Sequence, residues 1–219
     1  MKFERLASLY TGATAASYEA ERAASSQWLA EDAALDSYLN RLPRGSRVLD
    51  VPVGTGRFLE LYVRHGLNAV GIDISPDMLR LATEKAAALG LAPSLALGDV
   101  RKLAFPDASF DASICMRLLN WIDAKHIDAV LAEFSRVTRS MFVLSVKVYP
   151  VAGSWEHASN RLKNLWRQLR GAGMVTHDRR QLDLQLEGHG FWIEEARTIG
   201  SDRRGASYLI YLLRRERLS

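Results

Sequence analysis

Three aspartates of the sequence are placed where carboxylates could meet one ligand. Asp50 directly precedes a loop that contains Gly54 and Gly56. Asp73 follows 23 residues after Asp50, and Asp99 comes after one further apolar run. Glycines let the backbone approach a ligand closely, and a helix that begins after them offers free N–H groups. An acid about 20 residues beyond such a loop can accept hydrogen bonds from ribose hydroxyls, so the first two acids predict a nucleoside-binding site, in which the third could accept from an adenine amino group.

The elements that must position these residues alternate between short apolar runs and amphipathic segments. Strands are predicted at 47–51, 68–74, 94–97, 110–116 and 141–148. Helices are predicted at 13–40, 57–65, 76–89 and 124–139, the third with Ser75 as its N-cap and Pro76 in its first turn. Such alternation implies crossover connections and a mostly parallel sheet with helices on both faces. Ligands bind such sheets at the carboxyl ends of the strands, where the loop and the acids lie.

The end of the chain breaks this alternation. Segments 191–199 and 206–214 are both strand-like, and the gap between them is too short for a crossover helix. They must therefore form a hairpin, which predicts an antiparallel edge strand on the sheet. The predicted fold class is α/β, with about seven strands of which the last is antiparallel.

The stretch from 48 to 138 resembles the class I S-adenosylmethionine-dependent methyltransferases. The run Asp50-Val-Pro-Val-Gly-Thr-Gly56 is similar to their first motif, Asp73 matches the ribose-binding acid, and 98–100 matches the adenine-binding turn. Pro52 stands where the usual first glycine would be, as in members of the family with a Val-Pro-x-Gly-Thr-Gly loop. The resemblance implies a Rossmann-like fold, S-adenosylmethionine as cofactor and S-adenosylhomocysteine as product.

The resemblance also implies which residues form the site. The cofactor residues would be Tyr10, Tyr18, Asp50, Pro52, Gly54, Gly56, Asp73, Ile74, Met78, Asp99, Val100 and Met116. The two tyrosines would be aromatic caps in an N-terminal helical cap over 1–44, ahead of a methyltransferase domain over 45–219. Arg117 and Asn120, which follow the fourth strand, would hold a polar acceptor beside the methyl donor.

A segment at about 150–176 does not fit the alternation and is predicted to be an inserted helical segment. It carries an apolar stripe and a basic face that includes Arg161 and Arg170. Three interpretations stay open: a lid whose arginines face an anionic acceptor, a helix on a membrane surface with a lipid or lipid-linked envelope substrate, or a helix packed on the sheet with solvated charges. His157 and His177 flank the insertion and are candidate bases, and Arg117 is a further candidate catalytic residue. The sequence shows no spacing typical of a metal site.

Composition limits the class of protein. The chain has 219 residues, of which 48% are hydrophobic and 25% charged, as expected for a folded globular domain. Its single cysteine excludes an internal disulfide, and no apolar stretch approaches ~18 residues, the length of a membrane span. Without a secretory signal, the expected location is the cytoplasm. The net charge of +4 raises the possibility of a nucleic-acid substrate. The sequence, however, lacks the alternation of aromatic and basic residues that stacks bases, which favours a small-molecule acceptor.

Two other classes of function stay open. An NAD(P)-dependent oxidoreductase also uses a glycine loop and a ribose acid, but it would need a third glycine where this chain has Leu59. A non-catalytic S-adenosylmethionine-binding protein would carry the same binding motifs. In a methyltransferase the cofactor already carries the activated methyl group. In-line transfer therefore requires a general base only if the acceptor atom is protonated. The sequence assigns neither the acceptor atom nor the oligomeric state.

Overall fold

The computed structural model describes residues 25–92, 94–149, 174–202 and 205–215. Within these residues eight strands form one sheet with the order β3-β2-β1-β4-β5-β8-β7, and β6 pairs with β5. The strands are β1 (Arg47–Asp50), β2 (Asn68–Asp73), β3 (Ser94–Leu97), β4 (Phe110–Met116), β5 (Thr138–Tyr149), β6 (His177–Asp178), β7 (Phe191–Ser201) and β8 (Ser207–Arg215). The helices are α3 (Ser26–Leu39), α4 (Leu59–Arg64), α5 (Pro76–Ala88), η1 (Leu118–Trp121), α6 (Ala124–Val137) and α8 (Arg179–Gly188).

The parallel part of the sheet agrees with the sequence prediction. Strands β1 to β5 pair in parallel, and the bounds of β3 and β4 are those predicted. The capping of α5 is also as predicted, because the Met78 amide donates to the Ser75 hydroxyl at 3.3 Å. The predicted helix to residue 139 ends at Val137, since β5 starts at Thr138 rather than at 141.

The hairpin of β7 and β8 is present and the last strand is antiparallel, as predicted, but this strand does not form the edge of the sheet. The antiparallel strand β8 lies between β5 and β7, and β7 forms the edge. The reason is visible in the burial of each strand: the centre of β8 is buried continuously, whereas exposed and buried residues are mixed along β7. A continuously apolar strand exposes least apolar surface to water when other strands flank it on both sides. Strand β8 therefore takes the interior position.

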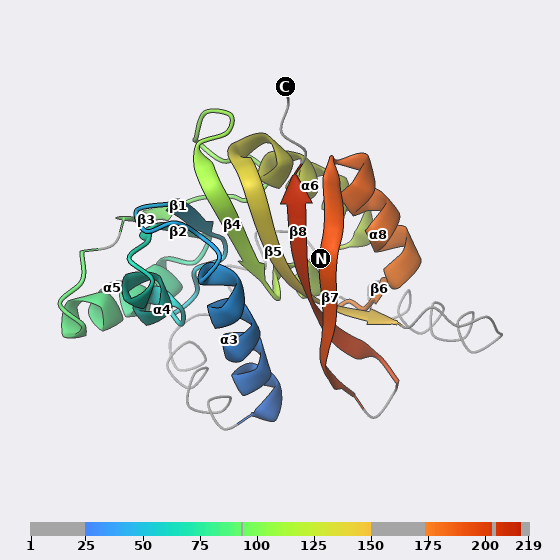
Figure 1. The fold of residues 1–219 in the computed structure, drawn as a ribbon, viewed down its shortest axis with the longest axis horizontal. Coiled ribbons are helices and arrows are strands. Elements are labelled where there is room, and N and C mark those ends of the chain that lie inside the picture. Colours follow the sequence, from blue (N-terminus) through green and yellow to red (C-terminus); the bar gives the residue numbers. More distant parts are fainter. Residues whose placement is uncertain (1–24, 93, 150–173, 203–204, 216–219) are drawn as a thin grey trace.

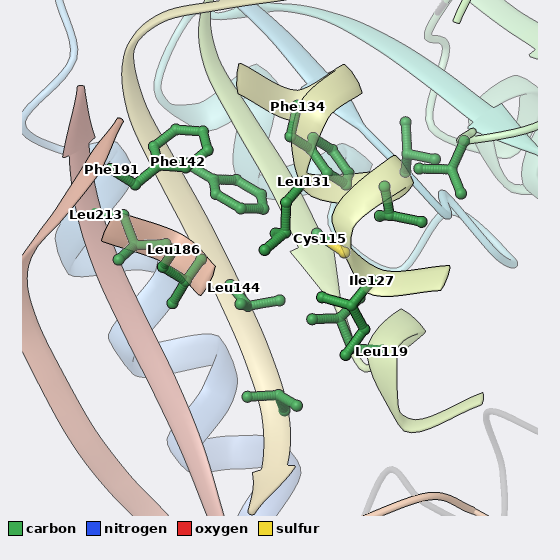
Figure 2. Packing of buried hydrophobic residues seen from close by; sticks show 14 of the residues in the cluster. Cys115, Leu119, Ile127, Leu131, Phe134, Phe142, Leu144, Leu186, Phe191 and Leu213 are labelled. Carbon is green, nitrogen blue, oxygen red and sulfur yellow. The ribbon is translucent and has the colours of Figure 1, made fainter. Parts of the chain in front are cut away.

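Helices cover both faces of the sheet, which makes a three-layer α/β/α arrangement (Figure 1). On one face, α3, α4 and α5 pack over β1, β4, β5 and β8 around buried residues such as Leu35, Tyr38 and Tyr62. On the other face, η1, α6 and α8 pack around a second cluster. Figure 2 shows its centre, where the ring of Phe142 stacks on Phe134 at 4.6 Å and contacts Phe191 at 5.0 Å.

Some of the predicted features lie outside the described residues. These are the two aromatic caps Tyr10 and Tyr18, the base candidate His157, and most of the predicted insertion with Arg161 and Arg170. In the part of the chain that the structure describes, no helix combines the length and the apolar character needed to cross a membrane.

Candidate functional site

A cleft opens at the carboxyl ends of β1, β2 and β4, where the sequence predicted the ligand. Its walls come from the loop after β1, the end of β2 and the segment after β4, with α3 supplying Trp28. The empty volume is about 820 Å³, part of which is open to solvent. Ligand pockets of about 300–1,000 Å³ hold molecules of cofactor size. Of the predicted cofactor residues, the cleft brings together Pro52, Gly54, Asp73, Ile74, Met78 and Met116.

One side of the cleft, the loop wall, consists of Pro52, Gly54 and Asp73. The Gly54 amide donates to Asp73 Oδ2 at 2.9 Å, and the Ser75 amide donates to Asp73 Oδ1 at 2.9 Å. Gly54 has φ +57°, a left-handed conformation that glycine adopts without steric cost. The carboxylate therefore ties the glycine loop to the end of β2 and faces the cleft.

Asp73 keeps the capacity to accept further hydrogen bonds. Burial raises the pKa of its carboxyl group, and the backbone amides of Ser75, Gly54 and Ile74 act in the opposite direction. A carboxylate has about four lone-pair sites, so these three amides still leave room for a donor from a ligand. A vicinal diol at this wall could donate to Asp73.

Gly56, within the loop, and Asp50, at the end of β1, are not among the residues that line the cleft. A Cβ on Gly56 would come within 2.7 Å of the Leu59 side chain, so this glycine permits close packing of the loop on the helices. Asp50 is buried beside Tyr62. Burial raises the pKa of Asp50 to about 7, the Tyr62 hydroxyl lowers it, and the negative charge of Asp73 raises it. Their assignment as cofactor contacts stays a prediction.

Asp99 and Val100 also lie outside the residues that line the cleft. The Asp99 carboxylate accepts hydrogen bonds from the guanidinium of Arg101 and from the Arg101 amide at 2.9 Å. The side-chain hydrogen bond from Arg101 is the main cause that lowers the pKa of Asp99. The predicted role of Asp99 toward an adenine amino group stays a prediction.

A second group of cleft residues, the arginine wall, consists of Trp28, Arg57 and Arg117, and the buried Glu31 pairs with both arginines. Arg117 Nε donates to both carboxylate oxygens of Glu31 at 2.9 Å, and Arg57 Nη1 donates to Glu31 Oε2 at 2.9 Å. The Ser145 hydroxyl donates to Glu31 Oε1 at 2.7 Å. The Trp28 ring lies under both guanidinium groups, 3.9 Å from Arg57 and 5.4 Å from Arg117.

Sequence reasoning missed Trp28, Glu31 and Arg57. A signal was present, since positions 28, 31, 35 and 38 follow the three- and four-residue spacing of a buried helix face and one of them is a glutamate. A charged residue on such a face is almost never fully buried unless it is paired. The pairing partners, however, come from distant parts of the sequence.

Asn120 and His177 are buried and do not line the cleft. Asn120 Oδ1 accepts from the Lys147 amide at 2.7 Å, which ties η1 to β5. His177 Nε2 lies 2.7 Å from the carbonyl oxygen of Leu119, and because a carbonyl only accepts, Nε2 is the donor. Burial lowers the pKa of His177, which favours the neutral ring. Both side chains are engaged in holding the segment after β4, and their predicted roles toward an acceptor remain untested.

The described side chains suit an organic ligand. Among residues 25–92, 94–149, 174–202 and 205–215, no group of three or more His, Cys, Asp or Glu side chains could hold a metal ion. The cleft instead pairs a carboxylate on the loop wall with guanidinium groups on the arginine wall, and the apolar Met116, Leu118 and Trp121 lie alongside. This arrangement can bind an elongated ligand that has hydroxyl donors at one end and an anionic group at the other.

Residues 48–141 match a family model described as a methyltransferase domain. The phosphatidylethanolamine N-methyltransferase of Cereibacter sphaeroides is 43% identical over 98 residues, which cover 44% of this chain and 47% of that protein. The demethylmenaquinone methyltransferase of Deinococcus radiodurans is 49% identical over 71 residues, which cover 32% of this chain and 30% of that protein. The matched segments thus span less than half of these curated relatives.

Among solved structures, the fold is similar to that of a 1,6-didemethyltoxoflavin-N1-methyltransferase from Burkholderia thailandensis, crystallised with S-adenosylhomocysteine. The TM-score is 0.68 at 17% identity, and the alignment covers 98% of this chain and 90% of that one. This likeness confirms the predicted fold class. The family model supports the predicted methyltransferase class, whereas the subgroup with a Val-Pro-x-Gly-Thr-Gly loop stays a prediction.

Proposed function

We propose that this chain is an S-adenosylmethionine-dependent methyltransferase that acts on a small-molecule or lipid-like acceptor. The observation that carries the proposal is the loop wall, where a glycine loop and the Asp73 carboxylate meet at the carboxyl ends of parallel strands. This wall lies inside the segment that matches the methyltransferase-domain model. The matched relatives are longer than the aligned segments, so the activity rests on the site as well as on the likeness.

The residues of the cleft fit this cofactor. A Cβ built on Gly54 would meet no atom within 4 Å, so the loop borders open space that a ligand can enter. Asp73 would accept from the ribose hydroxyls, while Ile74 and Met78 would flank the adenosine end. When bound, the cofactor supplies a methyl group activated on its sulfonium.

The remaining tasks of the chain are to orient the acceptor and to exclude water. Methyl transfer is an in-line displacement, so the acceptor atom must be held on the axis of the breaking bond. Trp28, Met116, Leu118 and Trp121 give the cleft an apolar side that keeps water from the reacting atoms. A general base is required only for an acceptor that is protonated at working pH.

The acceptor class is inferred from the cleft and from the relatives together. The names of the relatives refer to phosphatidylethanolamine and demethylmenaquinone, both larger and more apolar than most metabolites. The apolar side chains of Met116, Leu118 and Trp121 along the cleft suit an acceptor with an apolar body. We therefore place the acceptor among small or lipid-like molecules and leave the methylated atom open.

We further infer a helical cap over 1–44 on a methyltransferase domain over 45–219, with an inserted segment at about 150–176. The contacts of α3 support the cap, because Trp28 lines the cleft and Glu31 pairs with Arg117, which also lines it. A truncated variant that lacks residues 1–44 would then lose binding of the cofactor, although β1 to β5 remain.

The proposal is tested by isothermal titration of the purified chain with S-adenosylhomocysteine, with NAD and NADP in parallel. We expect binding of S-adenosylhomocysteine alone. Binding of a nicotinamide cofactor alone would contradict the proposal and favour an oxidoreductase. A second assay follows transfer of a labelled methyl group to phosphatidylethanolamine vesicles and to demethylmenaquinone, and tight binding without transfer to any acceptor would favour a non-catalytic binding protein.

A further inference from the structure

We infer that Arg117 binds the carboxylate at the amino-acid end of the cofactor and that Glu31 is the positioning residue that holds it there. The inference rests on the proposed function and extends it from the loop wall to the arginine wall. It also gives Arg117 a role different from the acceptor contact that the sequence suggested. The contacts of the guanidinium, its backbone and its place across the cleft carry the argument.

The guanidinium of Arg117 is held from one edge only. Its Nε donates to both oxygens of Glu31, whereas the buried Nη2 has no hydrogen-bond partner among the described residues. A buried donor without an acceptor is costly, and native structures rarely keep one without a ligand or a function. Arg117 lines the cleft, so an anionic ligand there is placed to supply the missing acceptor.

The backbone of Arg117 is held in an unfavourable conformation that presents the side chain to the cleft. Its φ of +62° lies in the left-handed region, which non-glycine residues seldom adopt. The Arg117 amide donates to the carbonyl oxygen of Ser145 at 3.0 Å, and the Ser145 hydroxyl donates to Glu31. One strand, β5, thus fixes both the backbone of Arg117 and the carboxylate that orients its side chain.

Arg57 completes the support of Glu31. Both of its terminal nitrogens are engaged, and only its buried Nε has no hydrogen-bond partner among the described residues. It donates to Glu31 through Nη1, and its Nη2 contacts the Trp28 carbonyl at 2.8 Å and Asp32 at 2.8 Å. The partly exposed Asp32 therefore balances Arg57 from the solvent side. Trp28 lies against both guanidinium groups and shields them from water, which strengthens their attraction for an anion.

The distance across the cleft suits one molecule that contacts both walls. In the sheet β1 lies between β2, which ends at Asp73, and β4, which leads into Arg117. Two strand spacings amount to about 10 Å. S-adenosylmethionine carries ribose hydroxyls on one side of its sulfonium and a carboxylate on the other, so a molecule with its ribose at Asp73 directs the carboxylate toward Arg117.

The test compares two ligands that differ only at the end in question. S-adenosylhomocysteine has the amino-acid end, whereas 5′-methylthioadenosine has the same adenosine and a thioether without it. The first variant is Arg117→Gln, and we expect its affinity for S-adenosylhomocysteine to fall by at least about tenfold, the loss of a charge-assisted hydrogen bond. Its affinity for 5′-methylthioadenosine should stay within about twofold.

The positioning role of Glu31 is tested by Ser145→Ala, which removes one hydrogen bond to the carboxylate and leaves both charges in place. We expect the affinity for S-adenosylhomocysteine to fall by several fold and that for 5′-methylthioadenosine to stay unchanged, so the ratio of the first to the second falls. The matched control is Ser113→Ala, because Ser113 is a buried serine on the neighbouring strand that is hydrogen-bonded to Thr138 at 2.6 Å and does not contact Glu31. This control should leave the ratio unchanged.

Three results would overturn the inference. If Arg117→Gln leaves the affinity for S-adenosylhomocysteine intact, the guanidinium does not bind the carboxylate. If Ser145→Ala weakens both ligands equally, the network around Glu31 is merely structural. If the wild-type chain binds neither ligand, the proposed function itself fails, and this result is distinguished from the other two because it appears before any substitution is made.

Discussion

The two walls of the cleft are built in different ways. The loop wall is held by backbone amides that donate to one carboxylate, and the Gly54–Asp73 contact spans 19 residues of sequence. The arginine wall is held by charged side chains around Glu31, whose partners Arg117 and Ser145 are 86 and 114 residues away in the sequence. The loop wall therefore forms with the parallel strands themselves, whereas the arginine wall forms only when α3 has docked on the sheet.

This difference sets how each wall responds to change. The loop should keep its shape when a side chain other than Asp73 is altered, because the strands, the glycines and the two amide contacts to Asp73 still direct it. A buried ion pair carries a high desolvation cost, so the loss of one partner leaves charge without compensation. We expect substitutions at the arginine wall to reduce stability, and those at the loop wall to act mainly on ligand binding.

The largest effect is expected for Glu31→Gln. The substitution leaves Arg57 and Arg117 without their shared buried carboxylate and should lower the free energy of unfolding by about 3–5 kcal/mol. Urea denaturation monitored by circular dichroism measures the loss. The control is Glu84→Gln, which breaks the exposed pair with Arg80 and should cost less than about 1 kcal/mol. Equal losses in the two variants would contradict the contrast between the walls.

Asp73→Ala should act on binding at the loop wall. The variant removes the acceptor for the ribose hydroxyls and also leaves the Gly54 and Ser75 amides without their acceptor. It should weaken S-adenosylhomocysteine by about 1–3 kcal/mol in isothermal titration. Because 5′-methylthioadenosine carries the same ribose, its affinity should fall equally, unlike the result expected for Arg117→Gln. Asp128→Asn, an exposed carboxylate on α6, serves as the control. A loss confined to one ligand would show that Asp73 does not contact the ribose.

Asp50, at the end of β1, should make stability depend on pH. Burial raises its pKa in the folded chain to about 7 from an ordinary value of 3.8, so the folded state holds a proton that the unfolded state releases. The free energy of unfolding should therefore decrease as pH rises from about 4 to 7, by roughly 1 kcal/mol per pH unit from this group. Urea denaturation at pH 5, 6, 7 and 8 should show a shallower slope for Asp50→Asn, and identical slopes would count against this role.

The smallest expected effect is a difference in stability between two variants of Arg117, which tests its backbone conformation apart from its side chain. Alanine and glycine both remove the guanidinium, but glycine adopts φ +62° without strain. Arg117→Gly should therefore be more stable than Arg117→Ala by about 1 kcal/mol, the reverse of the usual order in regular structure. Thermal unfolding of both variants measures the difference. An alanine variant as stable as the glycine variant would mean that the left-handed conformation is lost with the side chain.

The parallel strands were predictable because their signals are local. The apolar runs at β3 and β4, the Ser75 cap and the glycine loop each follow from residues close together in the sequence. The position of β8 was not predictable from the hairpin alone, because either strand of a hairpin could pair with β5. Continuous burial along the centre of β8 decided between them, and burial is a property of the assembled sheet.

The sequence by itself determined the alternation of strands and helices from β1 to β5, the glycine loop and the acid that closes it, since backbone conformation and short-range hydrogen bonds decide these features. It did not reveal η1, β6 or α8. Only the tertiary structure decided that Glu31 joins Arg57 and Arg117, and that Asp50 is buried beside Tyr62. Burial of a charge depends on which distant side chains meet it. The local sequence around a charged residue does not distinguish a side chain that faces water from one that is buried against a partner.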